Sequence, residues 1–409
     1  MHRIATLAVL VASLSLGASG AAAAVPYDLS ADPLDRAALL ALPSVYRVDV
    51  TIRVDALRGG DGEPIRLPRA ARTVREAGTA FAVAPGGWLA TARHVAAPEE
   101  ATIARLAYQE KLIAEDRPHG DAVVDALLER VGPLRVDARV VERRVRPADP
   151  DGGAAAGGYR ALPRVVASDS ADVALIRIDA PAAPALGLDD AASVGTPVMT
   201  IGFGSGGAFG GGARGELEPV VRRGSLGRTW TLEKAVPPHP VILVRVPAQG
   251  GDSGAPVVDG RGLVHGLVAF RSTEGGVRSG IAERASEVRR LLDSEGLTPG
   301  PDPAAAAFEA AMGALWGLDT REAQAGFRAT LAEFPDHTLA RRETARAAAL
   351  EDADFRLEGR PRRRGALLGL GVLAAAVAAG FAIALLRSVS GGRPGAPSPG
   401  REGRTGRLE

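Results

Sequence analysis

The chain has 409 residues, of which 46% are hydrophobic, and its 49 basic residues nearly balance 48 acidic ones. This length allows one large domain with a sizeable core and a smaller addition, and the balanced charge gives no long-range attraction to nucleic acid or anionic lipid. The absence of cysteine excludes disulfides, thiolate catalysis and most structural zinc sites, and the six histidines show no spacing that suits a metal. We therefore expect no metal, no cofactor and no nucleic-acid partner.

The amino-terminal residues have the pattern of a secretory signal. His2 and Arg3 precede an apolar run over residues 4–16, and the small residues of "GAAAAV" follow. A charged start, a short apolar core and an Ala-x-Ala ending are typical of a signal peptide. We expect a cleaved signal peptide over residues 1–24, with an uncleaved anchor as the alternative, and a polar lead-in over residues 25–42.

Short alternating stretches dominate residues 43–295. Each alternates apolar with polar residues between Gly and Pro, which is typical of β-strands joined by tight turns. Many such strands in one region indicate a β-sandwich or a β-barrel. The stretches are "YRVDVTIRV", "GTAFAVAPGGWLATA", "RVDARVVERRV", "DVALIRID", "PVMTIGFG", "VILVRVPA" and "GAPVVDGRGLVHGLVAF".

Two insertions interrupt this β region. Residues 98–131 are charged and have helical periodicity, which predicts a helical excursion, and "PDGGAAAGG" at residues 150–158 predicts a flexible loop. The region closes with "ERASEVRRLLDSEG", a predicted amphipathic helix that ends at Gly296. Residues 296–303 are rich in Pro and Gly and predict a stiff linker.

Residues 304–358 are predicted to be helical. The pattern breaks at "GLDTRE" and stops at Pro335, and "LARRETARAAALEDADF" predicts a further helix. Ala323, Phe327 and Pro335 lie where a tetratricopeptide hairpin places its small, aromatic and helix-ending residues. Because one hairpin buries little apolar surface alone, a degenerate tetratricopeptide unit and a plain helical spacer both stay open. Either would offer a surface to a protein partner.

Residues 365–386 carry no charge and lie between Arg364 and Arg387. A helix of this length, at 1.5 Å per residue, matches a hydrocarbon core about 30 Å thick. We therefore expect one transmembrane helix here and a disordered tail over residues 387–409. With a signal peptide, this predicts a single-pass protein of the bacterial inner membrane whose main domain faces the periplasm or the cell exterior. The bacterial origin is inferred from the excess of arginine over lysine and the absence of asparagine.

Three polar residues stand where hydrolytic chemistry needs them. Ser253 lies inside the glycine-rich run "QGGDSGAPVVDG", His94 follows the strand in "WLATARHVA", and Asp172 precedes the strand "VALIRI". Each alone is more often a structural residue than a catalytic one. Together they supply a nucleophile, a base that takes its proton and an acid that orients the base.

The glycines beside Ser253 fit the same chemistry. Gly251 lets the backbone turn so that its own N–H and that of Ser253 converge on one point. Two such donors stabilise a tetrahedral oxyanion, and each lowers the barrier by about 3 kcal/mol. The sequence leaves open which group pairs with Asp252, between these donors.

The order His94, Asp172, Ser253, in "TARHV", "DVALIRI" and "GDSGAPV", resembles a trypsin-like serine protease of the chymotrypsin fold. The nearest type is the bacterial, disulfide-free kind that includes the HtrA-type proteases. "GTAFAV" resembles the strand that leads to the family's histidine, and "VMTIGFG" the strand that opens its second barrel. The resemblance covers residues 43–295 and implies a mainly β, double-barrel protease domain that cleaves protein or peptide substrates. The HtrA type usually carries a PDZ domain, whereas helices are predicted to follow here.

The resemblance also implies residue roles. His94 becomes the general base, Asp172 the orienting acid and Ser253 the nucleophile, and the N–H groups of Gly251 and Ser253 become the oxyanion hole. Asp169 is the rival acid, but only Asp172 stands directly against the "VALIRI" strand.

The resemblance further places the specificity pocket. Pro247 and Ala248 fall at its base, and Gly280 and the strand "LVAFR" at its walls. Arg271 would either narrow this pocket or face solvent. Because the base carries no charge, a preference for basic side chains is not expected.

Two functions remain after this comparison. The first is a membrane-anchored serine endopeptidase that hydrolyses envelope or exported proteins through an acyl-enzyme. The alternative is a catalytically inactive protease fold that serves as a binding or scaffold protein of the cell envelope. The complete set of His94, Asp172 and Ser253 favours the enzyme, because an inactive relative has usually lost one of the three.

Overall fold

The structure is a computed structural model that describes residues 32–148, 158–179, 184–191, 193–204, 219–233, 235, 237–272, 279–300 and 303–358. The expected signal peptide, residues 25–31 of the lead-in, nearly all of the loop 150–158, the segment 365–386 and the tail 387–409 lie outside these residues. Export therefore stays a prediction.

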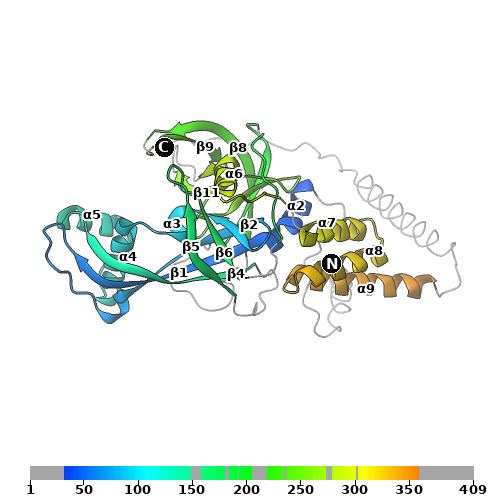
Figure 1. Cartoon of the computed structure of the whole chain (residues 1–409), viewed down its shortest axis with the longest axis horizontal. Coiled ribbons are helices and arrows are strands. Elements are labelled where there is room, and N and C mark those ends of the chain that lie inside the picture. The colour runs from blue at the N-terminus through cyan, green and yellow to red at the C-terminus, as the bar shows by residue number, and fades with distance from the viewer. Residues whose placement is uncertain are drawn as a thin grey trace, which may run out of the picture. The chain divides into compact units, whose positions relative to one another are not determined.

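Two closed β-barrels form the centre of the protein (Figure 1). The strand order is β1-β2-β3-β6-β5-β4 in the first barrel and β10-β11-β12-β9-β8-β7 in the second. All pairings between these strands are antiparallel. The strands are β1 (Val45–Arg58), β2 (Thr73–Ala84), β3 (Trp88–Thr91), β4 (Arg135–Pro147), β5 (Tyr159–Ala167), β6 (Ala174–Ile178), β7 (Pro197–Gly202), β8 (Val220–Leu232), β9 (His239–Val244), β10 (Pro256–Asp259), β11 (Val264–Ser272) and β12 (Ser279–Arg284). The double barrel expected from the sequence is present.

Alternation along β1 shows why these stretches form a barrel. Val48, Val50 and Ile52 are fully buried. Arg47 and Asp49, on either side of Val48, form an ion pair at 2.9 Å on the opposite face. Successive side chains of a strand point to opposite faces, so one face fills the core and the other meets solvent.

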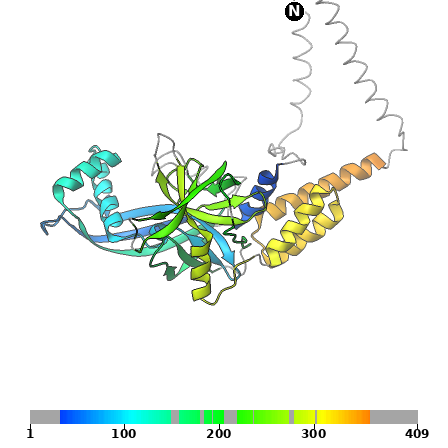
Figure 2. The ribbon, with the colours of Figure 1, turned by 90° about the horizontal axis from the view of Figure 1, so that it is seen from above.

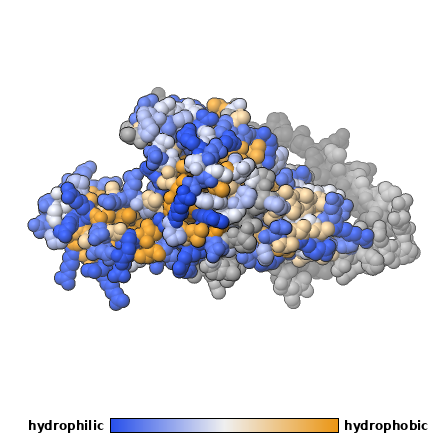
Figure 3. All heavy atoms as spheres, viewed as in Figure 1, coloured by the Kyte–Doolittle hydropathy of each residue, from blue (hydrophilic) through white to orange (hydrophobic). Residues whose placement is uncertain are grey.

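The helical excursion projects from one end of the first barrel (Figure 1). It comprises α4 (Glu100–Ala114) and α5 (Asp121–Val131). The long pair of β1 and β4 extends from Tyr46↔Pro147 to Arg58↔Arg135, with register shifts at Thr51/Ile52 and Val54/Ala56, and runs out beneath these helices (Figure 1). Hydrophobic surface gathers on this lobe in Figure 3. Ile113 on α4 is 43% exposed, and Val141 on β4 is 52% exposed.

The lead-in contains structure that the sequence analysis did not predict. Helix α2 (Pro33–Ala41) begins where Asp32 Oδ1 accepts a hydrogen bond from the Leu34 N–H at 2.9 Å, and a short 3-10 turn (Leu42–Ser44) leads into β1. Proline at the first helical position and an aspartate cap are favourable starts for a helix. The apolar side of α2 is buried. Its amphipathic pattern in the sequence could therefore have predicted this helix.

Helices follow the second barrel as predicted. Helix α6 (Ala285–Ser294) is followed by Gly296, whose φ is +66°, and α7 (Pro303–Trp316), α8 (Thr320–Glu333) and α9 (Thr338–Glu358) come next. The rings of Phe308 and Phe327 are 5.9 Å apart between α7 and α8. These two helices lie at the opposite end of the barrels from α4 and α5 (Figure 1, Figure 2).

The prediction of a transmembrane helix has to be corrected. No helix in the part of the chain that the structure describes is both long and apolar enough to cross a membrane. The longest, α9, has 21 residues, but charged residues such as Arg341, Arg342 and Glu343 recur along it, and each is costly in hydrocarbon. The segment 365–386 itself is not among the described residues.

Truncation of a core ring tests the first barrel. Phe81 on β2 is fully buried, so Phe81→Ala should lower the free energy of unfolding by about 3–5 kcal/mol through lost contacts and a cavity. Val141→Ala is the matched control, since Val141 is 52% exposed and its loss should change stability by less than about 0.5 kcal/mol. Urea unfolding followed by circular dichroism measures both. Equal effects of the two variants would contradict this core.

Candidate active site

His94 is held at the end of a strand by a single turn of helix. Strand β3 ends at Thr91, and α3 (Arg93–Ala96) follows immediately. The Val95 N–H donates to Ala92 O at 3.1 Å, which closes the turn. The imidazole is 31% exposed, so it is both supported and reachable.

Asp172 binds His94 at two points. Its Oδ2 lies 2.6 Å from His94 Nδ1, and its Oδ1 accepts the His94 backbone N–H at 2.9 Å. The Arg93 N–H also donates to Asp172 O at 3.2 Å. This arrangement favours the tautomer with hydrogen on Nδ1 and leaves Nε2 free as a base. The rival acid Asp169 is exposed to solvent, so the structure brings His94 to Asp172.

Acidic groups around His94 favour its protonated form. Burial lowers the pKa of His94, but the hydrogen bond and charge of Asp172, with the charges of Glu76 and Glu99, outweigh burial and raise that pKa above the ordinary value. Opposite charges nearby stabilise the imidazolium that forms when the base takes a proton. Glu76, on β2, is a carboxylate that the sequence analysis missed.

The loop that carries Ser253 packs against the first barrel. The Thr79 N–H on β2 donates to Ser253 O at 2.8 Å, and Thr79 Oγ1 donates to Gly251 O at 2.8 Å. Gly254 lies so close to Thr79 and Thr91 that an added Cβ would be 2.0 Å from Thr79 O and 2.6 Å from Thr91 Oγ1. Ser253 thus lies beside the end of the strand from which His94 projects.

The two predicted oxyanion donors are available. Among the described residues, neither the Gly251 N–H nor the Ser253 N–H donates a hydrogen bond to another backbone group. Gly251 has a φ of +94°, a conformation that favours glycine. Its carbonyl is held by Thr79, so this turn leaves the N–H groups free for a ligand.

Arg222 on β8 is the partner of Asp252 that the sequence left open. Its Nη1 lies 2.9 Å and 3.0 Å from the two carboxylate oxygens. Burial raises the pKa of Asp252, against the lowering effects of the Gln249 N–H, the Arg222 guanidinium and the Gly204 N–H.

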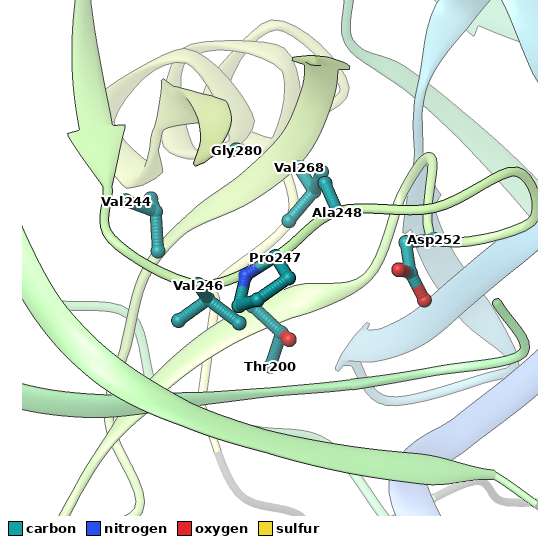
Figure 4. A pocket seen from close by; sticks show the side chains of 8 residues that line it. All are labelled: Thr200, Val244, Val246, Pro247, Ala248, Asp252, Val268 and Gly280. Atoms are coloured by element: carbon teal, nitrogen blue, oxygen red, sulfur yellow. The ribbon is translucent and has the colours of Figure 1, made fainter. Parts of the chain in front are cut away.

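A narrow pocket opens beside this loop (Figure 4). Most of its lining is apolar, and it includes the three predicted residues Pro247, Ala248 and Gly280. Arg271 is not among the lining residues and is exposed. Of the two positions expected for it, in the pocket or facing solvent, it therefore takes the second. The remaining lining residues are Thr200, Val244, Val246, Asp252 and Val268.

A buried acid of the second barrel supports Asp172 from behind. Glu283 on β12 is fully buried, and its Oε1 accepts the Asp172 N–H at 3.1 Å. His239 Nε2 lies 3.0 Å from Glu283 Oε2. Burial raises the pKa of Glu283 against the effects of these partners. The sequence analysis did not identify Glu283, which is the only acid in "SGIAER".

Metal ligands do not cluster in the part of the chain that the structure describes, where no group of three or more His, Asp or Glu residues could hold an ion.

Comparison with known proteins points to one family. Residues 78–267 match the family model of the trypsin-like peptidase domain. Among solved structures, the chain is similar to the active form of the Rv3671c protease from M. tuberculosis, with 18% identity, a TM-score of 0.40, and coverage of 66% of this chain and 88% of that one. It is also similar to the HtrA-type protease AlgW with a decapeptide, with 19% identity, a TM-score of 0.40, and coverage of 64% and 68%. A search of curated proteins finds no match.

The family match and the barrels describe the same part of the molecule. The matched range begins in β2 of the first barrel and ends in β11 of the second, and it contains His94, Asp172 and Ser253. This chain carries a trypsin-like serine peptidase domain.

Proposed function

We propose that this domain hydrolyses peptide bonds with Ser253 as nucleophile, His94 as general base and Asp172 as the acid that orients the base. The observation that carries the proposal is the double hydrogen bond from His94 to Asp172, at 2.6 Å and 2.9 Å. The Ser253 loop packs on β2, which pairs with the strand that precedes His94, through the 2.8 Å bond from Thr79 N–H to Ser253 O.

The reaction follows from these roles. His94 Nε2 takes the proton of Ser253 Oγ as this oxygen attacks the substrate carbonyl, and the negative charge on the carbonyl oxygen is met by the N–H groups of Gly251 and Ser253. His94 then gives its proton to the leaving amine, so an acyl-enzyme remains. Water, activated by the same histidine, releases the acid and restores Ser253. Asp172 stays ionised throughout and stabilises the imidazolium.

Substrate preference follows from the pocket. Val244, Val246 and Val268 surround Pro247 and Ala248 with apolar surface, so the side chain before the cleaved bond should be small or medium-sized and apolar. Thr200 and Asp252 supply the polar atoms, but the Asp252 carboxylate is engaged by Arg222, so it does not offer a free charge to a basic side chain.

Removal of the nucleophile tests the proposal first. Ser253→Ala and His94→Ala should each reduce kcat to background, and the double variant should cost little more because the groups act as a unit. Asp172→Asn should lower kcat by about 10⁴-fold because the wrong tautomer is then held. Asp169→Asn is the control and should keep wild-type turnover. Peptide hydrolysis and labelling by a fluorophosphonate probe measure these effects, and near-wild-type turnover by Ser253→Ala would leave the inactive scaffold as the better description.

The pH dependence of kcat/KM tests the charges around His94. Because the neutral imidazole is the base, kcat/KM should rise with pH through a midpoint above the ordinary histidine value of 6.5. Glu76→Gln removes a negative charge that raises the pKa of His94. The rise of kcat/KM with pH should therefore have its midpoint at lower pH in this variant. Glu333→Gln, at the end of α8, is the control. If the midpoint stays in place or moves to higher pH in Glu76→Gln, Glu76 does not raise the pKa of His94.

The pocket predicts both a preference and a way to change it. Wild type should cleave after Ala, Val or Leu rather than after Arg or Lys in a peptide library. A Cβ added at Gly280 would lie 3.6 Å from Ala248 Cβ, so Gly280→Val should fill the pocket and lower the ratio of kcat/KM for Leu over Ala. Gly313→Ala, on α7 with open space around it, is the control. Dominance of Arg and Lys at the cleaved position would contradict the pocket.

A further inference from the structure

Strand β4 has a long edge along which the described residues place no neighbouring strand. On one side, β4 pairs with β1 over nearly its whole length. On the other side, β5 pairs with it only at Arg144 and Val145. The backbone groups of residues 135–141 on this second edge make no hydrogen bond to a turn or loop of the described chain. An open edge of this kind is a template for a further strand.

The core holds this part of β4 in place without covering its outer face. Val136, Ala138 and Val140 pack against the core of the first barrel. Arg135 and Arg139, which alternate with them, are exposed. Successive side chains of a strand point to opposite faces. A strand added at the edge would therefore meet Arg135 and Arg139 on its solvent side, and the core would keep its packing.

Arginines outnumber carboxylates on the outer face beside this edge. Asp49, Asp55 and Glu142 each lie within ion-pair distance of two arginines, and the longest of these contacts is 3.6 Å. The arginines are Arg47 and Arg146 at Asp49, Arg53 and Arg139 at Asp55, and Arg144 and Arg160 at Glu142. Each guanidinium has more N–H donors than one carboxylate occupies. Each group of three therefore keeps one positive charge and attracts a further acidic group.

A bulge turns an apolar side chain outward among these arginines. The register of β1 and β4 passes from Thr51↔Glu142 to Ile52↔Val140, so Val141 has no partner on β1. Val141 is 52% exposed. An extra residue at a bulge points its side chain in a new direction and increases the local twist. The exposed side chains along the edge, at every second residue, are therefore those of Arg135, Asp137, Arg139 and Val141.

We propose that the open edge of β4 binds an extended acidic segment of a partner protein as an added antiparallel strand. The segment pairs its main chain with residues 135–141, over a length of about 23 Å. Its outward side chains meet Val141 with an apolar group and Arg139 and Arg135 with carboxylates. A neutral polar group falls opposite Asp137. Main-chain hydrogen bonds then supply affinity, and the alternate side chains supply specificity. The edge contains no active-site residue, so this inference goes beyond the proposed hydrolysis and does not depend on it.

Three other occupants fit the edge less well. A second copy of this chain would bring arginines against arginines, and like charges directly opposite destabilise a pair of strands. Single-stranded nucleic acid needs aromatic side chains on which its bases stack, and the β4 sequence "RVDARVVERRVRP" contains none. A flat lipid surface would not follow the pair of β1 and β4, because strands twist and the two register shifts of this pair add to the twist.

Fluorescence anisotropy with a labelled peptide tests the edge in the full chain. The peptide has the order Leu-Thr-Glu-Thr-Thr-Thr-Glu, which in an antiparallel pair places Leu beside Val141 and the two Glu beside Arg139 and Arg135. Arg139→Glu should raise its Kd about tenfold, because an attraction becomes a repulsion, and Val141→Asp should raise it to a similar degree. The controls are Arg328→Glu, exposed on α8, and Val194→Asp, 66% exposed, and both should bind like wild type.

Two N-methylated peptides distinguish an added strand from a contact between charges alone. In an antiparallel pair, the N–H groups of alternate residues point toward the partner strand and away from it. Methylation of one alternate set should therefore abolish binding, and methylation of the other set should leave Kd within about threefold of the unmodified value. Both peptides are used with the wild-type protein, so this test does not depend on whether a variant folds.

Four results would overturn the added strand. One is an equal Kd for the two methylated peptides, and another is an equal Kd for Arg139→Glu and Arg328→Glu. The third is tighter binding of an oligonucleotide or of phosphatidylserine vesicles than of the peptide. The fourth is loss of peptide binding when Ser253 is blocked by a fluorophosphonate, which would place the peptide in the proposed active site. None of them bears on the proposed function, which fails only if wild type neither cleaves peptides nor reacts with that probe.

Discussion

The contact of Thr79 with the Ser253 loop joins the two halves of the site. His94 and Asp172 belong to the first barrel and Ser253 to the second, so their chemistry depends on how the barrels meet. Thr79, fully buried on β2, donates its N–H to Ser253 O and its hydroxyl to Gly251 O, and Thr79 O accepts the Thr91 hydroxyl at 2.7 Å. Its hydroxyl also accepts the Phe203 N–H at 3.1 Å.

Small residues allow this contact to be so close. A Cβ at Gly78 would lie 2.6 Å from the Val95 side chain and 2.8 Å from Ser253 O, and Gly254 has a φ of +88° directly over Thr79. Side chains at these positions would push the Ser253 loop away from β2. The glycines on both sides of the interface therefore help to set the separation between Ser253 and His94, the proposed nucleophile and base. Buried polar groups of the backbone are satisfied across the interface by Thr79, which limits how far the barrels can shift.

Local patterns were sufficient to predict the barrels and the contact between His94 and Asp172, because alternation and the motifs around these residues are properties of short stretches. The catalytic roles of His94, Asp172 and Ser253 stay a prediction. Strand β8 was missed because its apolar and polar residues do not alternate. Gly224 and Gly227 lie where β9 approaches, with Arg245 O only 2.1 Å from an added Cβ at Gly224. Arg222 could not be told from Arg223 by sequence, since its partner lies 30 residues away and is reached only when the barrel closes.

Three buried carboxylates of the site also contribute to the stability of the folded barrels. Asp172, Asp252 and Glu283 are 7%, 1% and 0% exposed, and each is bonded by groups from other segments of the chain. Asp172 connects to Glu283 across the barrels through its own N–H. Loss of one partner of a buried charge typically costs about 3–5 kcal/mol, a large part of the about 5–15 kcal/mol that holds a domain folded. The groups that arrange the reaction therefore also help to hold the barrels together, and a loss of activity at these positions is informative only when folding has been measured in the same variant.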